Sequence, residues 1–240
     1  MSPGKKVFKM IGIYAGAIIV VAVVLFPYLW MVSGSFKSTL EIQSADFRDP
    51  DLAPRWIPRN FTLENYIRIN QTVRMLDYFK NSMIISGGTM VASILLSLFA
   101  AYSLSRFRFR LKGIYVGSLL ITQMFPGILF LIPYYVMFIV FNRLTGIQLR
   151  NSYVGMIFTY TSFALPFSIL MLRSFLAGIP KELDEQAQID GCSTLGIIFR
   201  IILPLARPGI AAVAIYGFIM AWNEMLFASV LTGTETKTVA

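Results

Sequence analysis

The sequence predicts an all-α integral membrane protein in which five stretches of chain cross a bilayer. Two observations support this class. Of the 240 residues, 56% are apolar and 14% are charged, whereas soluble domains average about 45–50% and about 25%. The mean hydropathy is +0.68. A soluble domain could not bury this many apolar side chains in its core, because it also needs a polar exterior. Helices are the expected spanning elements, because lipid offers an open backbone no hydrogen-bond partner.

Five runs of sequence are long and apolar enough to span. A hydrocarbon core about 30 Å thick needs roughly 20 apolar residues in a helix. Four runs lack Asp, Glu, Lys and Arg, and the fifth carries only Glu224. The predicted spans are 11–33, 81–105, 113–142, 151–172 and 208–231. The first run exceeds the roughly 7–15 apolar residues of a secretory signal and has no small-residue cleavage site, so we expect it to be retained.

The positions of Lys and Arg predict the orientation, since short cytoplasmic loops are enriched in both. Residues 1–10 include Lys5, Lys6 and Lys9, and residues 106–112 hold four cations. With alternating spans, both segments lie on one side together with the loop 173–207. We therefore expect a cytoplasmic N-terminus. The extracytoplasmic parts are then the segment 34–80, the loop 143–150 and the end 232–240.

The composition excludes several chemistries. The chain has no His, and its single Cys, Cys192, allows neither an internal disulfide nor a thiolate metal cluster. No GxxxxGK[ST] motif occurs, so no Walker-type ATP site is expected in this chain. The basic flanks of the spans account for most of the net charge of +9, so no nucleic-acid partner is expected. We expect no catalytic residue, no metal and no bound cofactor.

Two features within the spans leave alternatives open. Pro126 and Pro133 predict kinks in the third span, which either line a pathway or fit neighbouring helices. Glu224 is costly in hydrocarbon. It is either a pathway or gate residue or a satisfied contact near the membrane surface.

Residues 174–208 predict two short helices joined by a turn. Pro180 suits a first helical position, and Glu182, Asp184 and Glu185 would follow in the first turns, where acids favour the helix dipole. An apolar stripe recurs every four residues, at Ile179, Leu183 and Ala187. Gly191 would end the first helix, and Ser193 would cap the second. Pro204 and Pro208 would end the second helix before the fifth span. The acidic face suits a protein partner better than anionic lipid, with a plain solvated loop as the alternative.

The spacing within this segment resembles the EAA loop of ABC-importer permease subunits. That motif reads EAA, three residues, G, nine residues, then I-x-LP. The matching positions are Glu185, Ala187, Gly191, Ile201, Leu203 and Pro204. The chain departs from the pattern at Gln186 and Cys192, where the motif often has Ala, which affects fine packing.

Further stretches are similar to carbohydrate-type permeases, above all to the smaller permease subunit of maltose-type importers. They are residues 61–66, 81–82, 100–107 and 222–224. The resemblance implies an ABC-importer permease bundle. Members of that group have six spans, so we expect a sixth span to be missing from this chain.

The resemblance also implies a division of labour. A sister permease would complete the pathway, two ATPase subunits would hold ATP and Mg²⁺, and an extracytoplasmic sugar-binding protein would deliver the sugar substrate. The chain would lie among lipids as a multi-pass protein of a prokaryotic cytoplasmic (inner) membrane. The implied coupling residues are Glu185, Ala187, Asp190, Gly191, Ile201, Leu203 and Pro204. Glu185 would be the charged anchor on the ATPase, and Gly191 would allow the sharp turn.

Candidates for the substrate pathway are Trp222, Asn223, Glu224 and Tyr160. Amide and carboxylate groups suit sugar hydroxyls, and an aromatic ring can stack on a sugar ring. Alternatives to a sugar importer are an ABC permease for another solute, a secondary transporter, a membrane enzyme and a scaffold. A secondary transporter needs intramembrane ionisable residues and repeats, and only Glu224 is available.

Overall fold

The computed structural model describes residues 3–45, 49 and 53–239, and side chains from residue 9 onward. The predicted segments 1–10, 34–80 and 232–240 therefore fall partly outside the described residues, as do the side chains of Lys5 and Lys6. The described residues contain helices and no strands. Within that part of the chain, four helices are long and apolar enough to cross a membrane, or five if one bent pair counts as a span. The all-α membrane class is confirmed.

The chain divides into two units, Met1–Met75 and Leu76–Ala240, which we describe separately. The first unit holds α1 (Pro3–Ser35), α2 (Thr39–Gln43) and α3 (Glu64–Val73). The 27 residues Lys9–Ser35 of α1 form a candidate span. Aromatic pairs stabilise the segment after α1, including the stacked rings of Phe36 and Phe61, 4.7 Å apart.

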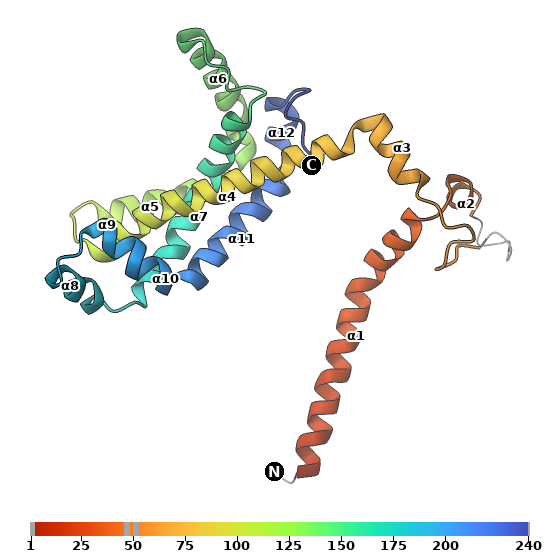
Figure 1. Ribbon diagram of the computed structural model, residues 1–240, viewed down its shortest axis with the longest axis horizontal. Coiled ribbons are helices and arrows are strands. Elements are labelled where there is room, and N and C mark those ends of the chain that lie inside the picture. The colour runs from red at the N-terminus through yellow and green to blue at the C-terminus, as the bar shows by residue number, and fades with distance from the viewer. Residues whose placement is uncertain (1–2, 46–48, 50–52, 240) are drawn as a thin grey trace. The chain divides into compact units, whose positions relative to one another are not determined.

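Three long helices form the centre of the second unit: α4 (Met75–Arg106), α7 (Tyr153–Ala177) and α11 (Arg207–Trp222). Figure 1 shows them side by side. Small residues allow close packing: a Cβ added to Gly217 of α11 would lie 3.5 Å from the Cα of Met90 in α4. The facing side of α4 carries a buried stripe of small polar residues, Ser86, Thr89, Ser93 and Ser97.

The stretch predicted as a single third span, 113–142, is divided into separate helices. It forms α5 (Lys112–Thr122), the 3₁₀ turn η1 (Gly127–Phe130) and α6 (Leu131–Thr145). The break comes just before and at Pro126, which has no N–H for an intrahelical bond. Pro133 does not break α6, because it lies in the first turn, where the backbone N–H groups need no intrahelical partner.

The predicted fifth span, 208–231, is also divided. It forms α11 and the short helix α12 (Leu226–Leu231), separated at residues 223–225. In both divided spans the apolar run is continuous in sequence while the helix is not, so hydropathy alone could not reveal the breaks.

The loop 173–207 forms four short elements at one end of the central helices (Figure 1). They are α8 (Glu182–Ile189), α9 (Thr194–Ile197), the π-helical turn η2 (Ile198–Ile202) and α10 (Leu203–Leu205). The path from α9 through α10 meets α11 at an angle of 82°. Pro180 precedes α8 rather than opening it, so that prediction was wrong: Lys181 is the N-cap.

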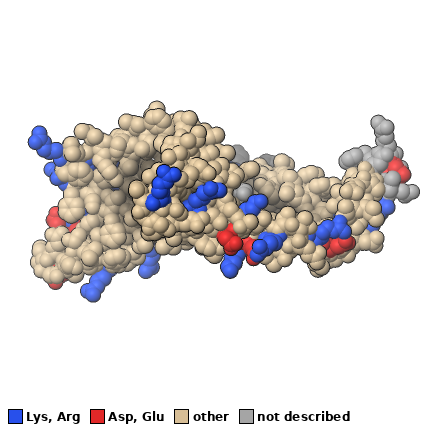
Figure 2. Space-filling model, turned by 90° about the horizontal axis from the view of Figure 1, so that it is seen from above, with Lys and Arg blue, Asp and Glu red and all other residues tan. Residues whose placement is uncertain are grey.

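Large apolar side chains remain exposed over much of the surface. In Figure 2, wide areas free of Lys, Arg, Asp and Glu separate the charged groups. Apolar surface on this scale marks contact with lipid or with other proteins.

Candidate functional site

Helix α8 presents two different faces. Asp184 and Ala187 are buried, and Leu183 is half-buried beside them. On the other face, Glu182, Glu185, Gln186 and Ile189 are exposed. Ile189 is the extreme case: 85% of its surface is accessible although it is a large apolar residue. The outward face therefore combines two exposed carboxylates with an exposed apolar side chain.

A sharp turn ends α8 at Gly191, which has φ = +83°. The N–H of Cys192 donates to Ala187 O at 2.9 Å, and the N–H of Gly191 donates to Gln188 O at 3.0 Å. This pair of bonds is the Schellman arrangement, in which a glycine adopts the left-handed conformation directly after a helix. The predicted role of Gly191 as the turn residue agrees with this geometry. Asp190 is the exposed C-cap residue.

The rest of the loop is packed into the bundle. The Ser193 hydroxyl accepts from Gly196 N–H at 3.2 Å and caps α9, as predicted. Ile201 and Leu203 pack against a core cluster made of residues from α4, α7, α8 and α11. Pro204 is half-buried at the start of α10. A shift of this loop would therefore act directly on the long helices.

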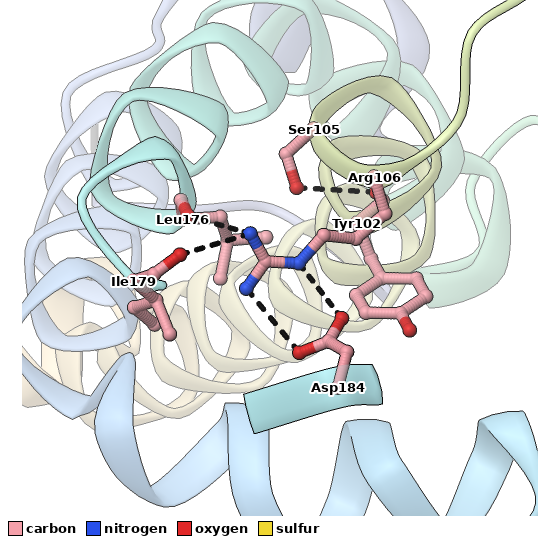
Figure 3. Close-up of polar contacts among 6 residues, drawn as sticks. All are labelled: Tyr102, Ser105, Arg106, Leu176, Ile179 and Asp184. Atoms are coloured by element: carbon pink, nitrogen blue, oxygen red, sulfur yellow. Dashed lines mark hydrogen bonds and ion pairs between the residues drawn. The ribbon is translucent and has the colours of Figure 1, made fainter. Parts of the chain in front are cut away.

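The loop also contains a buried ion pair that is not evident from the sequence (Figure 3). Arg106, the last residue of α4, donates from Nε to Asp184 Oδ2 at 2.8 Å and from Nη2 to Asp184 Oδ1 at 3.4 Å. Both side chains are 7% exposed. The sequence predicts a favourable position for Asp184 near the start of the helix and an acidic exposed face, whereas Asp184 is turned inward and buried. The two residues are far apart in sequence, and a charge pattern does not show which of several acids turns inward.

The proposed pathway residues Asn223 and Glu224 lie at the break between α11 and α12. The Glu224 carboxylate accepts from the N–H groups of Leu226 at 3.0 Å, Phe227 at 2.9 Å and Ala228 at 3.4 Å. The Asn223 side-chain amide donates to Ile219 O at 2.9 Å. These side chains thus cap the two helix ends, which accounts for polar groups in an apolar run.

The two aromatic pathway candidates lie in different surroundings. Tyr160 has no exposed surface, and its hydroxyl donates to Glu224 O at 3.3 Å. A sugar cannot stack on a ring enclosed in this way, so Tyr160 does not have the predicted stacking surface in this conformation. Trp222 is half-buried and stacks on Phe218, with centroids 5.6 Å apart.

A pocket of about 430 Å³ lies beside the break between α5 and α6. Of the four predicted pathway residues, only Glu224 lines it. Its other polar lining residues are Thr122, Gln123, Tyr134, Ser162 and Tyr216, and its aromatic ones include Phe125, Phe130, Phe163 and Phe227. The Tyr134 hydroxyl is hydrogen-bonded to Ser162. A sequence signal that could have indicated this pocket is Gln123, a polar residue three positions before Pro126 in a run without charges.

Comparison with known proteins identifies the family. The model for "Binding-protein-dependent transport system inner membrane component" matches residues 93–239. The inner membrane ABC transporter permease protein YcjP of Escherichia coli is 35% identical over 239 residues, covering 99% of this chain and 81% of YcjP. The diacetylchitobiose uptake system permease protein NgcG of Streptomyces coelicolor is 36% identical over 217 residues, or 90% of this chain and 67% of NgcG.

Two further matches agree. The trehalose/maltose transport system permease protein MalG of Thermococcus litoralis is 35% identical over 231 residues, or 95% of this chain and 77% of MalG. A chain in the crystal structure of a bacterial ABC transporter involved in the import of the acidic polysaccharide alginate has a similar fold. Its TM-score is 0.76 at 21% identity, over 99% of this chain and 78% of that one. The predicted membership in the ABC-importer permeases is confirmed. The chain is a multi-pass inner-membrane protein and belongs to the family of binding-protein-dependent transport system inner membrane components.

Proposed function

We propose that this permease is one half of the pathway of an ATP-driven sugar importer. A sister permease supplies the other half, two separate ATPase subunits supply the energy, and an extracytoplasmic binding protein delivers the sugar. Relatives that are named as permeases for diacetylchitobiose and for trehalose or maltose support the sugar. The chain has no Walker sequence, which supports hydrolysis of ATP and Mg²⁺ binding on the partner subunits.

The observation that carries this proposal is the outward face of α8. Glu185 and Ile189 project from a short helix that is fixed at its far end by the Gly191 turn. We assign this face to a cleft on the ATPase, with a basic group of the ATPase meeting Glu185 and an apolar site receiving Ile189. Closure of the ATPases would then move α8 and shift the bundle between two packings.

The pocket beside the α5–α6 break is our candidate for this chain's part of the sugar pathway. Aromatic rings with hydroxyl and amide groups suit a sugar, which presents both apolar ring faces and hydroxyls. Gln123 is exposed at its edge, and its amide both donates and accepts hydrogen bonds. We therefore assign the polar contact with the sugar to Gln123 instead of Asn223, because the Asn223 side chain caps α11.

Docking of α8 on a cytoplasmic ATPase implies an orientation for the spans. If α8 meets a cytoplasmic ATPase, the ends of α4 and α7 that contact it are cytoplasmic. With alternating spans, the N-terminus is then cytoplasmic as well. The basic residues 106–112 at the end of α4 agree with this arrangement.

Reconstitution tests the transport class. The permease is co-expressed with its sister permease and ATPase subunits and placed in proteoliposomes, with the binding protein and radiolabelled sugar outside and ATP inside. We expect uptake that requires ATP and the binding protein and that persists with a protonophore. Uptake that is abolished by the protonophore but does not depend on ATP would instead establish a secondary transporter.

Variants of α8 test the coupling face. Glu185→Lys should lower both retention of the ATPase subunits and uptake. Glu235→Lys makes the same charge change on an exposed residue beyond α12, outside the coupling loop, and is the matched control. Equal uptake and equal ATPase retention in the two variants would contradict docking through Glu185.

A further inference from the structure

We propose that Arg106 and Asp184 are positioning residues that join the coupling helix α8 to the ends of α4 and α7, so that a displacement of α8 reaches both spans. This inference rests on the proposed docking of α8. It assigns a role to the inward face of α8, whereas the docking proposal concerns the outward face.

The geometry joins three helices through one guanidinium group (Figure 3). Besides its two bonds to Asp184, Arg106 donates from Nη1 to Ile179 O at 3.0 Å and to Leu176 O at 3.4 Å. Leu176 belongs to the last turn of α7, and Ile179 follows that helix. Arg106 thus binds carbonyl groups at the end of α7 and the carboxylate of α8 while standing on the last turn of α4.

The chemistry of the pair suits a rigid link. The guanidinium group is planar and offers its N–H donors in a fixed fork, whereas a Lys ammonium group is a flexible point charge. Four hydrogen bonds from one guanidinium fix its orientation and that of the carboxylate. At 7% exposure, the surrounding side chains exclude most of the water that would screen the pair.

The pair also selects which face of α8 turns inward. Three acids lie in the first turn, and only Asp184 is buried. Removing one partner leaves an uncompensated buried charge, so Arg106 favours the rotation of α8 that keeps Glu185 and Ile189 outward. In Figure 3 the ring of Tyr102 stands beside the Asp184 carboxylate and closes the pair from the side of α4.

A buried ion pair is often no more stabilising than apolar residues of similar size in its place. Apolar residues would therefore hold α8 about as firmly, but they would not select which face of α8 turns inward. A purely stabilising role therefore predicts less folded complex but normal transport per ATP. A positioning role predicts that the complex assembles and hydrolyses ATP while less sugar moves for each ATP. The ratio of transported sugar to hydrolysed ATP separates the two roles.

The experiment uses the complete importer in proteoliposomes and measures ATPase retention, ATP hydrolysis and sugar uptake. We expect Asp184→Asn to retain the ATPase subunits, because Ala187 still packs into the core cluster and keeps Glu185 and Ile189 on the outward face. The sugar-to-ATP ratio should fall about tenfold, within the range by which single substitutions alter coupling. Glu235→Gln removes an exposed carboxylate beyond α12, outside the coupling loop, and should leave the ratio unchanged.

Two further variants keep the test decisive if Asp184→Asn yields too little complex. Arg106→Lys keeps the charge but loses the fork, and it should lower the ratio in the assembled importer. The exchange Arg106→Asp with Asp184→Arg should recover part of the ratio lost by either single change. A wild-type ratio in the assembled complexes of Asp184→Asn and Arg106→Lys would overturn the inference.

The failure of this inference and the failure of the docking proposal give different results. If Glu185→Lys releases the ATPase while Asp184→Asn and Arg106→Lys keep a normal ratio, docking stands and the positioning role is wrong. If Glu185→Lys retains the ATPase and normal uptake, docking of α8 through Glu185 is wrong.

Discussion

Replacing Glu224 by alanine should destabilise the permease by about 2 kcal/mol. The Glu224 carboxylate accepts three backbone N–H groups at the start of α12, at 2.9 to 3.4 Å. Loss of a side-chain cap costs about 0.5–2 kcal/mol, and loss of a negative charge beside a helix N-terminus costs about 0.3–1 kcal/mol more. Glu224→Gln keeps one carbonyl acceptor and should cost about 1 kcal/mol.

The assay is reversible unfolding in mixed micelles with increasing denaturing detergent, paired with ATP-driven uptake. Uptake per folded molecule should stay near wild type in both Glu224 variants, because the carboxylate is engaged by this chain's own backbone. Glu235→Ala, a change to an exposed carboxylate after α12, is the control. An unchanged free energy of unfolding with lost uptake would refute the capping account and return Glu224 to the pathway.

Three other substitutions have defined outcomes. Gly155→Ala would place a Cβ 2.0 Å from the backbone oxygen of Leu149, so size-exclusion chromatography should show little folded protein. Gly113→Ala is the control and should behave as wild type, because the added Cβ would meet no neighbouring side chain or other helix within 4 Å. Gly191→Ala forces φ = +83° on a residue with a Cβ and should cost about 1–2 kcal/mol in the same unfolding assay. Asn81→Ala removes donors to two backbone carbonyls beyond α12, at 3.1 and 2.9 Å, so hydrogen exchange there should accelerate; unchanged exchange would contradict this pairing.

The long helices were predictable because hydropathy and length are summed over many residues. The runs at 81–105 and 151–172 correspond to α4 and α7, although α4 starts earlier, at Met75. The breaks within 113–142 and 208–231 were not predictable from hydropathy, since the sequence stays apolar through them. Individual residues nevertheless indicate both breaks. Gln123 and Pro126 lie at the first, and the polar pair Asn223 and Glu224 lies at the second.

The turn residues of the coupling loop were predictable because caps and turns depend on near neighbours. Gly191 and Ser193 occupy the predicted positions, since a left-handed turn and a hydroxyl cap each involve only a few residues. The partner of Asp184 was not predictable in this way, because Arg106 comes from another helix. The pocket likewise depends on how α5, α6, α7 and α11 meet in space.

A photo-crosslinking amino acid in place of Ile189 tests the central claim, that this permease receives its energy through α8. Ile189 is 85% exposed on the outward face of the helix. Irradiation of intact membranes containing the complete importer should join it to an ATPase subunit. The same amino acid in place of Ile147, which is 56% exposed in the loop between α6 and α7, should give no such product. Crosslinking to the ATPase from Ile147, or its absence from Ile189 in an importer that transports, would contradict the account.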